Sequence, residues 1–187
     1  MGQCLAQAAL ELNHQVVIVS GPTNIQYPPA AELILVSTTE QMLEACLEQF
    51  DRCEGMIGAA APCDYRPVQV SDQKLKKTGE PIMLHLIETP DVVATLGKSK
   101  RSDQWIVGFA LETEDLHFRA VTKLHKKCCD LIVINGPDAM SSPTNSVEIL
   151  NPSGEIVANF SGPKSIVAEA IVAEIQSRLI DAPLAAQ

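Results

Sequence analysis

The chain has 187 residues, of which 46% are hydrophobic, and its formal net charge at pH 7 is -9. This length suits one α/β domain over residues 1–181 with a flexible tail over 182–187, and the negative charge argues against binding to nucleic acid or to an anionic membrane. No stretch approaches the roughly 18 apolar residues of a membrane span, and the six cysteines show no zinc-binding spacing, so we expect a cytoplasmic protein.

Hydrophobic periodicity and turn residues predict helices that alternate with short apolar strands. A Thr-x-x-Gln pattern at Thr38 and Gln41 predicts a capping box at the start of one helix. In chain order the predicted elements are a helix over 2–13, strands over 15–20 and 33–38, a helix from Thr38 to Phe50, strands over 55–61 and 82–88, a helix over 90–97, a strand over 105–110, a helix over 114–127, a strand over 130–135, a hairpin built from 146–150 and 155–160, and a helix from about Pro163.

This alternation predicts a Rossmann-like α/β fold with three layers, in which helices cover both faces of a parallel sheet and a β-hairpin lies near the C-terminus. In such a sheet the ligand crevice lies beyond the carboxyl ends of the strands. The unusual local sequence falls at those ends, because Ala60 and Asp64 follow one strand, Thr89 follows another, and Phe109 and Asn135 end two more. We therefore expect a ligand site there, although an Asp after a strand also serves as an ordinary turn former.

Positive charge is concentrated in the middle of the chain. Between Arg66 and Lys127 there are eleven basic and eight acidic residues, so this segment carries +3 and the rest carries -12. A local positive zone on an acidic protein suits a small anion such as a phosphate, although a solvated face accounts for it too. Lys74, in a loop with other lysines, and the pair Lys123 and Lys127, four residues apart on a helix, are the candidates for this role.

Several short motifs occur together in one order. They are "AAAPCDYRP" over 59–67, "KLKK" over 74–77, "ETPDVVATLG" over 88–97, "VGFALETED" over 107–115, the Lys123 and Lys127 pair, and "DLIVIN" over 130–135. This combination resembles the phosphopantothenoylcysteine synthetase domain, the second half of the bifunctional coenzyme A biosynthesis flavoprotein. The resemblance covers almost the whole chain.

The resemblance implies a ligase that joins 4'-phosphopantothenate to cysteine. CTP, with Mg²⁺, activates the carboxylate as an acyl-cytidylate with loss of pyrophosphate, and the cysteine amine then displaces CMP. It also implies a homodimer, and FMN belongs only to a fused decarboxylase half that is absent from this sequence. Lys74 would act during turnover, Ala60 would border the substrate, and no metal ligand set of the protein's own is implied. The residues implied to bind CTP are Asp64, Lys74, Thr89, Pro90, Asp91, Val92, Phe109, Lys123 and Lys127.

The chain departs from the family pattern in three places. Pro62 and Cys63 replace the usual residues of the first motif, and Thr89 stands where Asn is frequent. The family also places a strand and an Asn/Ser-Ser-Gly-Lys loop before the helix over 2–13, so we expect the chain as written to have impaired activity and open sheet edges. A non-catalytic nucleotide-binding or dimerisation remnant of the family is therefore the alternative. An NAD-dependent oxidoreductase is disfavoured, because no G-x-G-x-x-G follows a strand.

Overall fold

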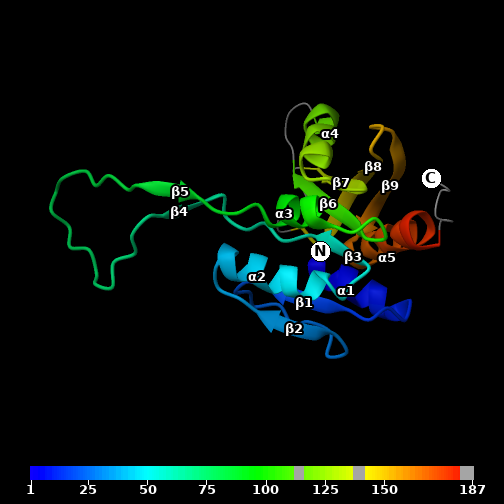
Figure 1. Ribbon diagram of the computed structural model, residues 1–187, viewed down its shortest axis with the longest axis horizontal. Coiled ribbons are helices and arrows are strands. Elements are labelled where there is room, and N and C mark those ends of the chain that lie inside the picture. Colours follow the sequence, from blue (N-terminus) through cyan, green and yellow to red (C-terminus); the bar gives the residue numbers. More distant parts are fainter. Residues whose placement is uncertain (112–115, 137–141, 182–187) are drawn as a thin grey trace.

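The computed structural model describes residues 1–111, 116–136 and 142–181, which form layers of helices around a β-sheet and a long projecting arm (Figure 1). The helices are α1 (Gly2–Glu11), α2 (Thr39–Phe50), α3 (Val92–Ser99), α4 (Leu116–Lys126), α5 (Lys164–Ile175) and a terminal π-helix, η2 (Gln176–Ile180). The strands are β1 (Val17–Ser20), β2 (Glu32–Leu35), β3 (Gly55–Gly58), β4 (Tyr65–Pro67), β5 (Leu86–Glu88), β6 (Trp105–Leu111), β7 (Leu131–Asn135), β8 (Thr144–Leu150) and β9 (Ile156–Pro163).

The main sheet has five strands in the order β3-β6-β7-β8-β9. The pairs β3–β6 and β6–β7 are parallel, and β8 and β9 continue the sheet as antiparallel strands. The predicted α/β fold and the predicted C-terminal hairpin are thus confirmed, and the hairpin makes the main sheet mixed. No helix in the described ranges has the length and apolarity that a bilayer crossing requires.

Each face of the main sheet packs against its own group of helices. On one face, Val107 and Val133 are fully buried in a cluster with α1 and α5, and on the other, Ile106 and Ile132 pack against α2, α3 and α4. Side chains alternate between faces along a strand, so apolar strands such as β6 and β7 supply both clusters. The alternation confirms the predicted three layers.

The first two strands form a separate sheet, which the sequence reading did not anticipate. β1 pairs only with β2 in the described part of the chain, in parallel, and no ladder joins either strand to β3. Val19 on β1 and Met56 on β3 nevertheless pack against the same apolar cluster beneath α2. The expectation of open sheet edges is therefore met at β1 and at β3.

The predicted strand over 82–88 is wrong. Only Leu86–Glu88 is extended in a ladder, and it pairs antiparallel with Tyr65–Pro67 at the root of an arm that projects from the domain (Figure 1). Apolar side chains beyond this root, such as Met83 with 85% of its surface exposed, have no core to enter. A local apolar run predicts extended chain but not what the chain packs against, which is why the reading failed here.

The helix boundaries follow local signals closely where a cap is present. The predicted capping box at α2 is confirmed, since the Thr38 hydroxyl accepts the Gln41 N–H at 3.2 Å and the Gln41 side chain accepts the Thr38 N–H at 3.2 Å. The helix predicted over 114–127 is described from Leu116. Its first two residues, like the predicted tail over 182–187, lie outside the described residues.

Asp130, at the entry to β7, joins two strands and a loop. Its carboxylate accepts the Lys100 ammonium at 2.6 and 2.5 Å and the Ile106 N–H at 2.7 Å. We expect Asp130→Asn to lower the free energy of unfolding by about 2 kcal/mol, because it leaves a half-buried lysine without its counter-charge. Urea unfolding checks this, with Glu174→Gln, which breaks an i,i+4 pair to Arg178, as a control that should cost about 0.5 kcal/mol. Equal effects of the two changes would contradict the assignment.

Candidate functional site

The site is built where the parallel strands β3, β6 and β7 end. At this edge the chain leaves β3 through residues 59–64, enters the arm, and returns from it at Thr89 to begin α3. Crevices at the carboxyl ends of such strands are the usual ligand sites of open α/β sheets. For the position that ligands take in such sheets, we name residues 59–64 and 89–92, together with the Lys127 side chain that reaches Asp91, the crevice.

The two legs of the arm meet at the crevice. The Thr89 N–H donates to the Asp64 carbonyl oxygen at 2.9 Å, and the Thr89 hydroxyl donates to the Cys63 carbonyl oxygen. Two predicted site residues from distant motifs, Asp64 and Thr89, are therefore in direct contact. The Thr89 side chain therefore supplies a hydrogen-bond donor at the position where the resembled family often has Asn.

The start of α3 forms the next part of the crevice. Asp91 is the N-cap, and its carboxylate accepts the Ala94 N–H at 3.0 Å. Its other oxygen lies 3.2 Å from the Lys127 ammonium. Val92 is buried in the core, so it presents backbone rather than side chain to the crevice. Because Asp91 already satisfies one of the first amides, an anion at this helix start would meet the remaining ones together with Lys127.

Lys123 and Lys127 lie one helical turn apart at the end of α4. The Lys127 N–H donates to the Lys123 carbonyl oxygen at 2.9 Å. The backbone of Lys127 approaches α3 very closely, because a Cβ atom on Gly97 would lie 2.0 Å from the Lys127 carbonyl oxygen. Gly97 is therefore the residue that lets the end of α4 sit against α3, with the Lys127 side chain beside Asp91.

Ala60 follows the end of β3, whereas Phe109 lies inside the neighbouring strand β6, two residues before that strand ends. Gly58 of β3 pairs with Gly108 of β6, so both predicted residues fall just past the same rung of the sheet. The Phe109 side chain packs against the cluster formed with α1 and α5, whereas Asp91 and Lys127 belong to the elements on the opposite face. Phe109 therefore lies on the face of the sheet opposite to α3 and α4, and its assignment to the site stays a prediction.

Lys74 lies on the arm, away from the other site residues. It is exposed, and within the described ranges it forms neither a hydrogen bond nor an ion pair. Lys76 and Lys77 are likewise exposed on the arm. Asp64, Thr89, Asp91 and Lys127 therefore form one connected group, with Lys123 one helical turn before Lys127 and Lys74 outside the group.

Two residues of α2 that the sequence did not indicate, Thr39 and Glu40, contact the chain between β3 and the arm. Arg66 Nε donates to Glu40 Oε1, and the Cys63 thiol lies 3.8 Å from the Thr39 hydroxyl. The hydrogen bond from its own backbone N–H, followed by that from Arg66, holds the pKa of Glu40 below its usual value. The capping box predicted this helix start, but no sequence pattern indicated what it would touch.

The neighbouring cysteines at the end of α4 differ in exposure. Cys129 is buried in the core, and burial raises the pKa of its thiol to about 11, while Cys128 is exposed. A thiol with this pKa is protonated near neutral pH and is a poor nucleophile. Cys129 is therefore a packing residue.

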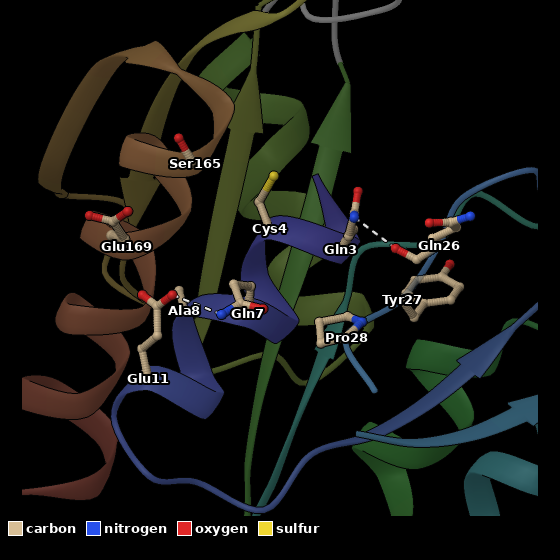
Figure 2. A pocket seen from close by; sticks show the side chains of 10 residues that line it. All are labelled: Gln3, Cys4, Gln7, Ala8, Glu11, Gln26, Tyr27, Pro28, Ser165 and Glu169. Carbon is tan, nitrogen blue, oxygen red and sulfur yellow. Dashed lines mark hydrogen bonds between the residues drawn. The ribbon is translucent and has the colours of Figure 1, made fainter. Parts of the chain in front are cut away.

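A hollow of about 400 Å³ lies elsewhere, on the outer flank of α1 (Figure 2). It is lined by α1, by the β1–β2 connection near Tyr27 and by α5, and it contains the carboxylates of Glu11 and Glu169. No lysine or arginine lines it, so it lacks the charge that a phosphate requires. We therefore expect no phosphate site in this hollow.

Known proteins resemble the chain along most of its length. The family model of the DNA/pantothenate metabolism flavoprotein C-terminal domain matches residues 1–179. The coenzyme A biosynthesis bifunctional protein CoaBC of Bacillus subtilis is 38% identical over 159 residues, which is 82% of this chain and 39% of that protein. The chain thus spans less than half the length of this relative.

Two solved structures have a similar fold. The C-terminal domain of a coenzyme A biosynthesis bifunctional protein CoaBC superimposes with a TM-score of 0.77 at 31% identity, covering 94% of this chain and 80% of that chain. A Cab2 mutant in complex with phosphopantothenate-cysteine superimposes with a TM-score of 0.73 at 15% identity, covering 95% of this chain and 76% of that chain. At this lower identity the likeness concerns the fold alone.

Proposed function

Because the chain belongs to the DNA/pantothenate metabolism flavoprotein C-terminal domain family, we propose that it is a ligase domain that joins 4'-phosphopantothenate to cysteine by way of an acyl-cytidylate formed from CTP. The observation that carries this proposal is the contact between Asp91 and Lys127, joined through Thr89 to Asp64. Three motifs that are far apart in sequence meet there, around one cationic group at a helix start.

The reaction moves negative charge onto pyrophosphate as the carboxylate attacks the α-phosphorus of CTP. Cations fixed along the triphosphate lower the free energy of that transition state more than that of the bound substrate. Lys127 and Lys123 occupy a fixed position at the end of α4, and we assign them the triphosphate. Lys74 would approach from the arm, and Ala60 would border the phosphopantothenate, since it has no side chain beyond Cβ to block it.

Asp91 has a definite role before the nucleotide arrives. Its carboxylate pairs with Lys127 and caps α3, so it holds the ammonium at the crevice without a ligand. A phosphate that replaces this partner meets a lysine already in position, which reduces the ordering cost of binding. Asp91 thus positions Lys127 so that a phosphate can replace the Asp91 carboxylate as its partner.

Mg²⁺ fits this crevice only as a companion of the nucleotide. No group of three or more His, Cys, Asp or Glu side chains suited to a metal occurs among the residues described. Mg²⁺ commonly needs only one or two carboxylates plus substrate phosphates, and the Asp64 side chain is exposed at the crevice to provide one. When bound, the ion would neutralise phosphate charge.

The test of the proposed function is pyrophosphate release. The chain supplied with phosphopantothenate, CTP and Mg²⁺ should release pyrophosphate, and addition of cysteine should then release CMP and form the amide. Calorimetry with CTP separates the alternative, since binding without pyrophosphate release would support a non-catalytic remnant. Absence of both binding and release would overturn both candidates.

We also propose that the arm joins two copies of the chain into a homodimer in the cytoplasm. The arm exposes several large apolar side chains that its own domain leaves uncovered, and it carries the open edges of β4 and β5. Its charges balance, with four basic and four acidic residues over 62–88, whereas the whole chain carries -9. Two acidic chains therefore repel each other least at their arms. The exposed apolar residues are Tyr65, Val68, Val70, Leu75, Ile82, Met83, Leu84, Leu86 and Ile87.

Charge placed on the arm should break this dimer. We expect the double change Met83→Lys and Leu84→Lys to shift the chain from dimer to monomer in sedimentation equilibrium, because two buried lysines at the contact would lack counter-charges. The matched control is Ile166→Lys on α5, where the side chain is 54% exposed. A wild-type chain that sediments as a monomer at all accessible concentrations would exclude the dimer.

A further inference from the structure

The outgoing leg of the arm is attached to the first turn of α2. Arg66, the middle residue of β4, donates from Nε to Glu40, and Cys63 contacts Thr39 with sulfur and oxygen 3.8 Å apart. Glu40 and Arg66 each keep 43% of their side-chain surface exposed. The ion pair is thus a surface contact between a helix of the domain and the root of the arm.

The backbone that carries Glu40 is fixed by the first turn of α2. The capping box of Thr38 and Gln41 fixes the turn that carries Glu40, and the Gln41 side chain also accepts the Ser37 N–H at 2.8 Å. Its own backbone N–H, followed by the Arg66 side chain, lowers the pKa of the Glu40 carboxyl. The carboxylate is therefore ionised near neutral pH and pairs with the Arg66 guanidinium.

Arg66 lies two residues from Asp64, roughly 7 Å along an extended chain. The Asp64 carbonyl oxygen accepts the Thr89 N–H, which ties the two legs of the arm together next to β4. A shift of β4 would therefore move both Asp64 and Thr89. The returning leg runs directly into α3 and Asp91, whereas the side-chain ion pair of the outgoing leg goes to α2. The angle at which the arm leaves the domain therefore depends on α2.

We propose that Glu40 and Arg66 are a positioning pair, which anchors the root of the arm to α2 and so restricts the directions from which Lys74 can approach a nucleotide held at Lys123 and Lys127. The role rests on the proposed function and requires no contact of either residue with the substrates. An exposed ion pair adds little to global stability. The ion pair has a larger effect on the position of the arm, because a small rotation at the root displaces all the residues beyond it.

The variants that test this pair are Glu40→Gln, Arg66→Gln, the double change, and Arg66→Lys. We expect each Gln variant to lower kcat about tenfold while the Kd for CTP changes less than about threefold, because misplacement of a reacting group costs turnover and the crevice lysines stay in place. The double variant should be no worse than either single one, and Arg66→Lys should recover most of the loss. The midpoint of thermal unfolding should stay the same.

Hydrogen exchange over residues 62–88 gives a second readout that does not depend on activity. Both Gln variants should exchange faster in this segment than the wild-type chain, while Arg52→Gln, which breaks the exposed pair with Glu32 at the other end of α2, should not. If the wild-type chain releases no pyrophosphate, the proposed function fails, and the exchange experiment still decides the role of the pair. Unchanged exchange in the Gln variants, or additive losses in the double variant, would overturn the proposal.

Discussion

Lys74→Gln should slow pyrophosphate release by about 10²-fold, because it removes a positive charge that the arm brings to the triphosphate as negative charge develops on the leaving group. The loss should fall on kcat rather than on the Kd for CTP, since Lys74 lies apart from the connected group around Lys127 in the unliganded chain. Rapid-quench measurement of the first turnover separates this step from product release.

Lys76 provides the matched control, because it is an exposed lysine on the same arm and two residues away. Lys76→Gln should change the first turnover by no more than about threefold, as expected for the loss of a general positive potential. Equal losses for Lys74 and Lys76 would show that the arm contributes diffuse charge, and an unchanged rate for Lys74→Gln would remove its assignment.

Gly97→Ala should destabilise the domain and weaken CTP binding together. The added Cβ would lie 2.0 Å from the Lys127 carbonyl oxygen and 3.0 Å from its carbonyl carbon, so backbone has to move. Helix propensity favours Ala over Gly by about 1 kcal/mol, while forced overpacking costs about 3 kcal/mol. The overpacking is larger, and we expect a net loss of about 2 kcal/mol in the free energy of unfolding.

The movement would displace Lys127 from Asp91, so the Kd for CTP should rise about tenfold. Chemical unfolding and calorimetry measure the two effects in the same preparation. Gly2→Ala is the matched helical control, because nothing lies within 4 Å of a Cβ placed there. A stabilised Gly97→Ala variant would show that α3 and α4 are not held in the close contact described.

The fold was predictable where local signals and burial agree. Residues of β6 and β7 are apolar on both sides, and the sequence of such strands demands helices on both faces, which α1, α4 and α5 supply. The Thr38 and Gln41 pattern likewise predicted a helix start, since all its partners are within four residues. These features depend on short-range chemistry that the sequence displays.

The arm and the divided sheet were not predictable from the same signals. Residues 82–88 are as apolar as a core strand, but their exposure depends on where the root at Tyr65 and Glu88 directs them. The strands β1 and β2 also have ordinary strand sequences. These sequences do not indicate that β1 and β2 form a sheet separate from β3. Periodicity carries no information on that pairing.

The candidate site was predictable only in part. The strand ends predicted that Asp64 and Thr89 lie at one edge of the sheet, whereas Lys123 and Lys127 were identified only as a pair on one helix face, and the contact of Lys127 with Asp91 depends on how α3 and α4 pack. The contact of Glu40 with Arg66 links residues 26 positions apart, and no spacing rule predicts it. Phe109 packs on the face of the main sheet that α1 and α5 cover, opposite to α3 and α4. This placement also depends on tertiary packing rather than on its motif.

The central claim is that the crevice lysines hold a nucleotide triphosphate, and calorimetric titration of CTP with Mg²⁺ into the wild-type chain and into Lys127→Ala tests it most directly. We predict one binding site per chain in the wild type and a Kd at least about tenfold higher in the variant, since a charge-assisted contact to phosphate is lost. The same Kd for both proteins, or no binding to the wild type, would contradict it.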